Sequence, residues 1–281
     1  MATDQLDELT VLDRPASNIP RVWPGARVRR GLLGGLGFVL AWTLLAWSVP
    51  AYLLPTPVAV ATAFVGELTA PAVYAVPVSG AQITLTALLV ALLESLTHYL
   101  PGLVLGVGLG IPLGIAMGWF PRLEEICGPV VGLLRPIPPL AWMGLVIVWV
   151  GIGHAGAAVI VALGSFWITF YSALEGVENL PPEYTDVGRS LGIERDRVML
   201  RKIVVPGIAP SVLTGIRTSI GRSWMLVVAA ELFGAPGLGY EIIATAQGLS
   251  MDVSMAYMLA LGLVYLSFDT GFQRARGVIG Q

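Results

Sequence analysis

Charged residues are scarce in this sequence: Asp, Glu, Lys and Arg make up 12% of its 281 residues, whereas 56% are hydrophobic. Soluble domains carry about 25% charged residues, so there is too little polar surface here to cover a water-soluble globule of this size. The composition therefore predicts an integral membrane protein whose helices are solvated by lipid.

Cysteine, histidine and phosphate-binding loops are also scarce or missing. The single cysteine, Cys127, excludes an intrachain disulfide, and we interpret it as a small packing residue. The two histidines, His98 and His154, lie far apart in the sequence and have no metal-ligand spacing, so each is expected to be an interfacial residue. Neither a catalytic site nor a metal site is predicted, and nothing indicates nucleic-acid binding. Because the sequence has no Walker-type loop, any chemistry of ATP and Mg must come from another chain.

Six apolar stretches are long enough to cross a bilayer core, which requires about 20 residues per helix. We place these spans at about 31–50, 99–118, 130–150, 156–175, 208–229 and 253–272. The first stretch lacks the small-residue pattern of a signal-peptide cleavage site, so it is interpreted as an uncleaved span. Residues 82–98 are apolar but interrupted by polar side chains, and could be a seventh span.

The distribution of Lys and Arg decides between six and seven spans, because these residues accumulate on the cytoplasmic side. With six spans and a cytoplasmic N-terminus, the outside segments 51–98, 151–155 and 230–252 contain no Lys or Arg. A seventh span would place the five basic residues of the 177–207 loop outside. Residues 82–98 are then an external amphipathic helix or an extension of the second span.

The domains expected are a cytoplasmic tail (1–30), a transmembrane domain (31–275) and a cytoplasmic C-terminal tail (276–281).

Glycine recurs at every fourth position in the second predicted span. This spacing lets helix backbones approach closely in lipid, so these residues are predicted to pack against another helix. The glycines concerned are Gly102, Gly106, Gly110, Gly114 and Gly118. A nucleotide-binding glycine loop is excluded here, because no strand precedes it and no acidic residue follows at the required distance.

Prolines and arginines interrupt other apolar stretches. Arg135 precedes three prolines within four residues, which indicates either a proline kink near the cytoplasmic face or backbone that lines a pathway. Arg217 and Arg222 lie about 14 and 21 Å along the fifth predicted span, at a depth where a charge normally faces a bundle interior or water. They are expected either to pair with a carboxylate such as Glu231 or Glu175, or to attract an anionic solute.

The 177–207 loop is the most charged internal segment, and here the sequence resembles a known family. Residues 186–192 resemble the EAA loop of binding-protein-dependent ABC permeases, with Asp in place of Glu and Gly in place of the second Ala. The distance from Gly192 to Pro206 is one residue longer than the usual pattern. The loop residues assigned to this motif are Glu183, Asp186, Val187, Gly188, Arg189, Ser190, Leu191, Gly192 and Pro206.

Shorter matches extend the resemblance over about residues 40–275, and they are similar to the nitrate, sulfonate and taurine branch. They include Gly110-Ile-Pro-Leu-Gly114, Leu134-Arg-Pro-Ile-Pro138, Trp149-Val-Gly-Ile-Gly153, Ala230-Glu231-Leu232 and Gly237-Leu-Gly-Tyr240. His98 departs from that branch, which often has Arg before the second span.

The resemblance implies an all-α membrane protein of six transmembrane helices, with the type I ABC importer fold and cytoplasmic coupling helices. It also implies a permease homodimer, two ATPase subunits that bind ATP and Mg, and an extracytoplasmic solute-binding protein. The function expected is import of a sulfonate, taurine or nitrate-like oxyanion, with no enzyme activity in this chain. The alternatives are a permease for a vitamin or pyrimidine precursor, or an ATP-independent channel or secondary transporter.

Overall fold

The computed structural model describes residues 24–75, 81–232 and 234–279, and the side chains of all of these except 24–27 and 275–279. The chain divides into two compact units, Met1–Val49 and Pro50–Gln281. In the first unit, the helix α1 (Pro24–Ser48) contains the first predicted span.

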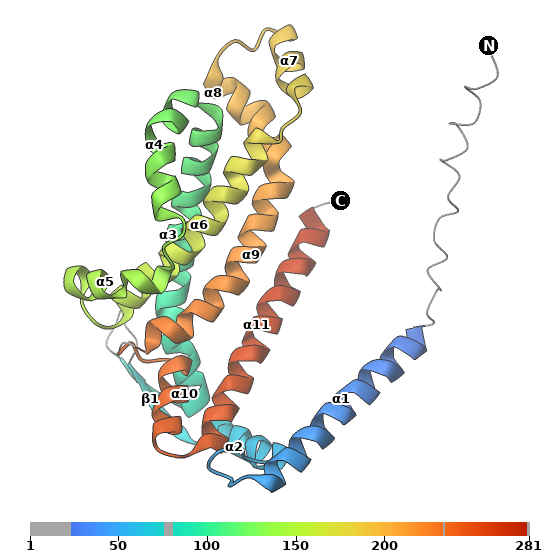
Figure 1. Ribbon diagram of the computed structural model, residues 1–281, viewed down its shortest axis with the longest axis vertical. Helices are drawn as coiled ribbons and strands as arrows, with labels where there is room; N and C mark the ends of the chain where they lie inside the picture. The colour runs from blue at the N-terminus through green and yellow to red at the C-terminus, as the bar shows by residue number, and fades with distance from the viewer. Residues whose placement is uncertain (1–23, 76–80, 233, 280–281) are drawn as a thin grey trace, which may run out of the picture. The chain divides into compact units, whose positions relative to one another are not determined.

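The second unit is built almost entirely of helices (Figure 1). Its elements are α2 (Pro57–Thr69), β1 (Pro71–Ala75), β2 (Gln82–Thr86), α3 (Ala87–Trp119), α4 (Pro121–Leu134), η2 (Pro139–Trp142), α5 (Met143–Val150), α6 (His154–Glu178), α7 (Pro182–Ser190), α8 (Asp196–Met199), η3 (Leu200–Val204), α9 (Val205–Glu231), α10 (Leu238–Gln247) and α11 (Met251–Ile279). Within the described ranges, five helices are long and apolar enough to cross a membrane, and a bent pair makes a sixth if it counts as one span.

The bent pair corrects the third predicted span, which was expected to be one helix over 130–150. The helix α4 ends at Leu134, and the chain turns by 88° before η2 and α5 continue. Prolines at 136, 138 and 139 remove backbone donors, which explains why the helix cannot continue. The break follows directly after α4, which has 14 residues and is therefore about 20 Å long.

The second span is longer than predicted and settles the status of residues 82–98. Residues 87–98 form the first turns of α3, so they extend the second span rather than form a separate external helix. Residues 82–86 form β2, which pairs antiparallel with β1 in the register Pro71 to Thr86 and Ala75 to Gln82. This short hairpin was not predicted.

The glycine stripe of α3 lies where this helix packs against α6. A Cβ atom on Gly102 would lie 2.5 Å from the Ala158 carbonyl oxygen, and one on Gly118 would lie 3.2 Å from the Leu174 carbonyl oxygen. The three intervening glycines face the carbonyls of Ala162, Phe166 and Phe170 in the same register. The stripe therefore sits against one row of carbonyls on α6, spaced four residues apart, and the two backbones approach too closely for side chains.

An aromatic cluster fixes α9 between α3 and α11. The ring of Trp224 packs edge-on against those of Tyr99 and Phe268, at centroid distances of 5.1 and 5.3 Å. The Tyr99 hydroxyl donates to the Ile220 carbonyl, and Trp224 Nε1 donates to the Leu261 carbonyl. Both polar tips are thus paired, so the rings can be buried at little cost.

Candidate functional site

The segment predicted to couple to an ATPase folds as a short helix with a defined end. The helix α7 ends in a Schellman motif: the Ile193 N–H donates to the Gly188 carbonyl, and the Gly192 N–H donates to the Arg189 carbonyl. Gly192 has φ +80°, as expected for a glycine that reverses the chain. Gly188 lies against both η3 and the end of α8, because a Cβ there would overlap the Ile203 side chain and lie 2.8 Å from Met199 Sδ.

Between Gly192 and Pro206, where the resemblance implies one residue more than the usual pattern, the chain forms a π-helical turn. Residues Leu200–Val204 form the π-helix η3, between α8 and α9. A π turn closes its hydrogen bonds one residue further along than an α turn, so it accommodates a single inserted residue. Met199 and Val204 are both buried in the same small apolar cluster as Ile208, so the turn is packed on both sides.

An open apolar groove of about 710 Å³ lies between α7 and the start of α9. Tyr184, Val187 and Leu191 line it and are 54%, 58% and 75% exposed. Lys202, Ile203, Pro206, Gly207 and Pro210 form its other wall, with Glu183 at its edge. Asp186, Arg189 and Ser190 lie on the exposed surface of α7, where Arg189 Nη1 is 3.4 Å from Asp186 Oδ1. A contiguous exposed apolar surface of this kind is typical of a protein contact.

The structure brings Arg217 to a carboxylate that the sequence analysis did not consider. Its Nε and Nη2 both lie 2.9 Å from Oδ1 of Asp269, so α9 is tied to α11. The Gln273 amide donates to Oδ2 of the same carboxylate at 2.6 Å. Arg217 thus pairs with a carboxylate, which was one of the two expectations, but the partner is Asp269 and not Glu231 or Glu175.

Arg222 is exposed and has no hydrogen bond or ion pair with any residue that the structure describes. It follows Thr214 and Thr218 at intervals of four residues, which places the three on one face of α9. Both threonine hydroxyls donate to carbonyls of their own helix. Arg135 differs, since its guanidinium lies 4.1 Å above the Tyr171 ring.

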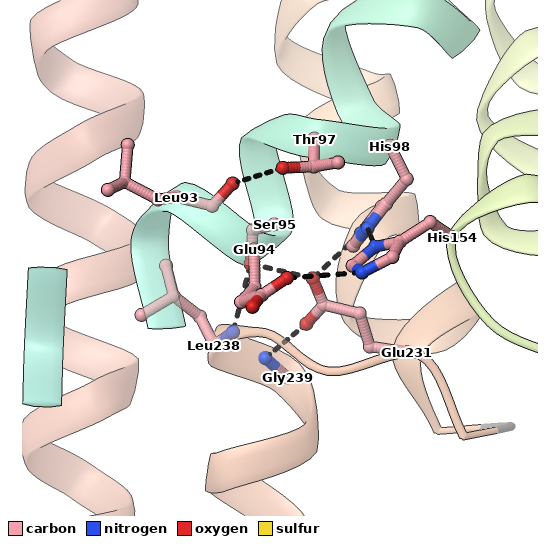
Figure 2. A network of polar contacts seen from close by, with 9 residues as sticks. All are labelled: Leu93, Glu94, Ser95, Thr97, His98, His154, Glu231, Leu238 and Gly239. Carbon is pink, nitrogen blue, oxygen red and sulfur yellow. Dashed lines mark hydrogen bonds and ion pairs between the residues drawn. The ribbon is translucent and has the colours of Figure 1, made fainter. Parts of the chain in front are cut away.

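Glu231 is the centre of a buried polar cluster that joins four helices (Figure 2). Its Oε1 accepts from the Ser95 hydroxyl at 2.6 Å and lies 2.9 Å from His98 Nε2, and both partners are on α3. Its Oε2 accepts from the Gly239 N–H at the start of α10. Glu231, His98 and Ser95 are all fully buried.

The two histidines meet in this cluster. His98 Nδ1 lies 3.2 Å from Nδ1 of His154, the first residue of α6, and the two rings stack at 5.5 Å. Nε2 of His154 lies 3.1 Å from Oε2 of Glu94, one turn before His98 on α3. The expectation that both are separate interfacial residues is therefore wrong for His98. The one signal in the sequence was Glu94 and His98 at i, i+4 on a single helix.

The residues that the structure describes contain no group of three or more His, Cys, Asp or Glu side chains placed to hold a metal ion. Cys127, interpreted as a packing residue, is exposed on α4.

Residues 106–281 match the family described as binding-protein-dependent transport system inner membrane component, and the chain belongs to that family. Members are ABC transporter permeases, which are not enzymes themselves.

Among relatives, a putative ABC transporter permease of Methanocaldococcus jannaschii is 37% identical over 159 residues, which cover 56% of this chain and 59% of that protein. The taurine transport system permease protein TauC of Escherichia coli is 34% identical, with 56% of this chain and 57% of that protein covered. A bicarbonate transport permease, CmpB of Synechococcus elongatus, is 31% identical, with 54% and 56% covered. The match thus spans a little over half the length of these relatives.

The fold is also that of solved ABC importer structures. A chain of the MetNI methionine ABC transporter, in an inward-facing conformation, superimposes with a TM-score of 0.58 at 20% identity, and covers 68% of this chain and 95% of that one. A second crystal form gives a TM-score of 0.57. The expected all-α permease fold with six spans is confirmed, the third span being the bent pair.

Proposed function

We propose that this ABC permease imports a small oxyanion, in the class of sulfonates, taurine, nitrate or bicarbonate. The observation that carries the proposal is Arg222, a cation without a carboxylate partner in the described structure, deep in the α9 span. An arginine that faced lipid at this depth would cost about 2.5–3.5 kcal/mol, so its exposed face is assigned to a polar pathway. The names of TauC and CmpB, which refer to anionic or zwitterionic solutes, support this choice.

The energy for transport comes, in this proposal, from separate ATPase subunits that bind ATP and Mg. The groove between α7 and α9 receives them, because it presents exposed apolar side chains on a segment with five basic residues, which is assigned to the cytoplasm. An extracytoplasmic binding protein delivers the solute. The pathway lies between two copies of this chain, so the exposed Arg222 faces a second protomer rather than lipid. The tails at 1–30 and 276–281 lie in the cytoplasm.

The test is solute uptake by the complete complex in proteoliposomes. The variant Arg222→Gln is expected to lower uptake of the transported oxyanion about tenfold, about 1.4 kcal/mol, while the complex still assembles and hydrolyses ATP. Arg222→Lys keeps the charge and should retain most of the uptake. Normal uptake by Arg222→Gln would show that the solute does not contact this residue, and would remove the basis for an anionic solute.

A further inference from the structure

The polar cluster around Glu231 contains both histidines of the chain and none of the lysines or arginines whose side chains the structure describes. Its members form an unbroken series of contacts in the order Glu231, His98, His154, Glu94. The series links the end of α9 to α3 and then to the first residue of α6 (Figure 2). Its proton content follows from its donors and acceptors.

Two backbone groups fix the direction of the hydrogen bonds at Glu231. The Leu238 N–H can only donate, so the Ser95 oxygen accepts from it at 2.9 Å and the Ser95 hydroxyl proton points to Glu231. The Gly239 N–H likewise donates to the other carboxylate oxygen. Both carboxylate oxygens accept from donors, so Glu231 is ionised. In its contact with His98, the proton is therefore on His98 Nε2.

The remaining contacts set the number of protons. Each of the three contacts in the series joins two atoms that can both accept a hydrogen bond. Each contact is therefore a hydrogen bond only if one of its two atoms carries a proton. Three contacts therefore require three protons, whereas two neutral imidazoles carry only two. The third proton lies either on a ring or on the Glu94 carboxyl, and it is assigned to a ring because the ionised, buried Glu231 needs a positive partner. The cluster in this geometry holds one additional proton, so one ring is an imidazolium between two carboxylates.

No other cation on the surrounding segments can take the place of that imidazolium. The segments 31–121, 151–188 and 223–273 contain no Lys or Arg. Other titratable groups near the cluster have partners elsewhere: Tyr74 of β1 contacts Thr97, Tyr99 donates to the Ile220 carbonyl, and Glu67 of α2 accepts from Tyr257. Glu241 of α10 lies near Glu67. A buried carboxylate such as Glu231 requires a positive partner, and the histidine pair supplies it.

We propose that His98 and His154 form a proton-binding site, and that the bound proton fastens the start of α6 to α3 and α9. When the proton leaves, one contact is left with two facing lone pairs, and the outer ends of these helices are no longer held together. The site lies at the end of the bundle that the distribution of Lys and Arg places outside the cell, and its outer members His154 and Glu94 are 36% and 18% exposed there to external pH. This inference does not depend on which solute the permease carries.

The direct test uses the two histidines as the probe, because they are the only ones in the chain. The intact permease–ATPase complex, labelled with nitrogen-15 histidine, is placed in nanodiscs and its ring nitrogens are followed by NMR. At about pH 7.5 a free imidazole is about one-tenth protonated. We expect one of the two rings to be almost fully protonated at that pH, a roughly tenfold excess.

The variant Glu94→Gln is expected to remove the additional proton without changing the packing of the helices. Its amide can donate to His154 Nε2, so every contact is satisfied with two neutral rings. We therefore expect the imidazolium signal at about pH 7.5 to disappear, although the helices remain packed. Glu67→Gln is the matched control, because it neutralises a carboxylate that contacts Tyr257 and no histidine. This control should leave both ring spectra unchanged.

Thermal stability gives a second readout. The folded state binds one more proton than the unfolded state, so the unfolding temperature of the wild type should fall as pH rises through proton release. That of Glu94→Gln should change less over the same range. If Glu94→Gln does not assemble, His154→Gln replaces it and should leave His98 neutral. Two neutral rings in the wild type at neutral pH, or an imidazolium that survives Glu94→Gln, would overturn the proposal.

Discussion

Arg217 and Asp269 form the ion pair that ties α9 to α11, with two guanidinium nitrogens on a single carboxylate oxygen. Neither residue is fully buried within the chain, with side chains 42% and 25% exposed. The pair nevertheless lies within two membrane-spanning helices, where a charge without its partner is poorly solvated.

We expect Arg217→Gln to destabilise the permease by about 1 kcal/mol, because it leaves the Asp269 carboxylate with only Gln273 as a donor. The measurement is the thermal unfolding of the purified complex in detergent. The double variant Arg217→Gln with Asp269→Asn should lose less stability than the sum of the single variants. Strict additivity would mean that the two side chains do not interact.

The register of α3 on α6 can be tested with two glycines of the same helix. Gly110→Leu should prevent packing, because even a Cβ there would overlap Thr169 and the Phe166 carbonyl. Overpacking of this kind costs about 1–3 kcal/mol or more, and we expect most of the assembled complex to be lost. Gly108→Leu is the control, since its Cβ would have no neighbour within 4 Å. Equal yields of the two variants in size-exclusion chromatography would contradict the observed packing.

Substitutions of Gly192 test whether the backbone conformation at this position is needed to couple ATP hydrolysis to transport. A Cβ at this position would meet nothing within 4 Å, so a substitution acts through the positive φ alone. Gly192→Val should uncouple ATP hydrolysis from transport and lower uptake at least tenfold, since β-branched residues tolerate this region poorly. Gly192→Asn tolerates it and should transport normally. If the Val variant imports solute at the wild-type rate, the segment is a linker and not the coupling contact.

The orientation of the chain is predicted from the distribution of Lys and Arg and can be measured by labelling. In a Cys127→Ala background, Tyr240→Cys on α10 should react with a membrane-impermeant thiol reagent added to whole cells. Arg195→Cys should react only after the membrane is opened. Both positions are exposed, so access is not limited by packing. The reverse pattern would invert the six-span topology, and would place the histidine pair inside the cell.

The spans and the glycine stripe could be predicted because each depends on a local pattern. Twenty apolar residues or glycines four apart determine a helix and its packing face with little help from distant residues. The same is true of Gly192, where the motif itself requires a reversal of the chain. The bend after Leu134 was visible only as an excess of prolines, because a proline shows where a helix is weakened but not the angle that follows.

The pairing of polar residues could not be predicted in this way. Glu231 was expected as one partner for the arginines, but its carboxylate points to α3, and Arg217 pairs with Asp269 instead. Which helix faces which is decided by the packing of α3, α6 and α9, and this depends on contacts between residues more than fifty positions apart. The hairpin of β1 and β2 was missed for the same reason, since strands take their stability from a partner strand.

The π turn at Leu200–Val204 directly precedes α9, so it affects the direction in which the faces of that helix point. One residue inserted into a continuous α-helix would rotate everything beyond it by about 100°. Arg222 and the threonines before it would then point to another side of the bundle. Because the widened turn takes up one residue locally, the face of α9 that carries Arg222 keeps its direction.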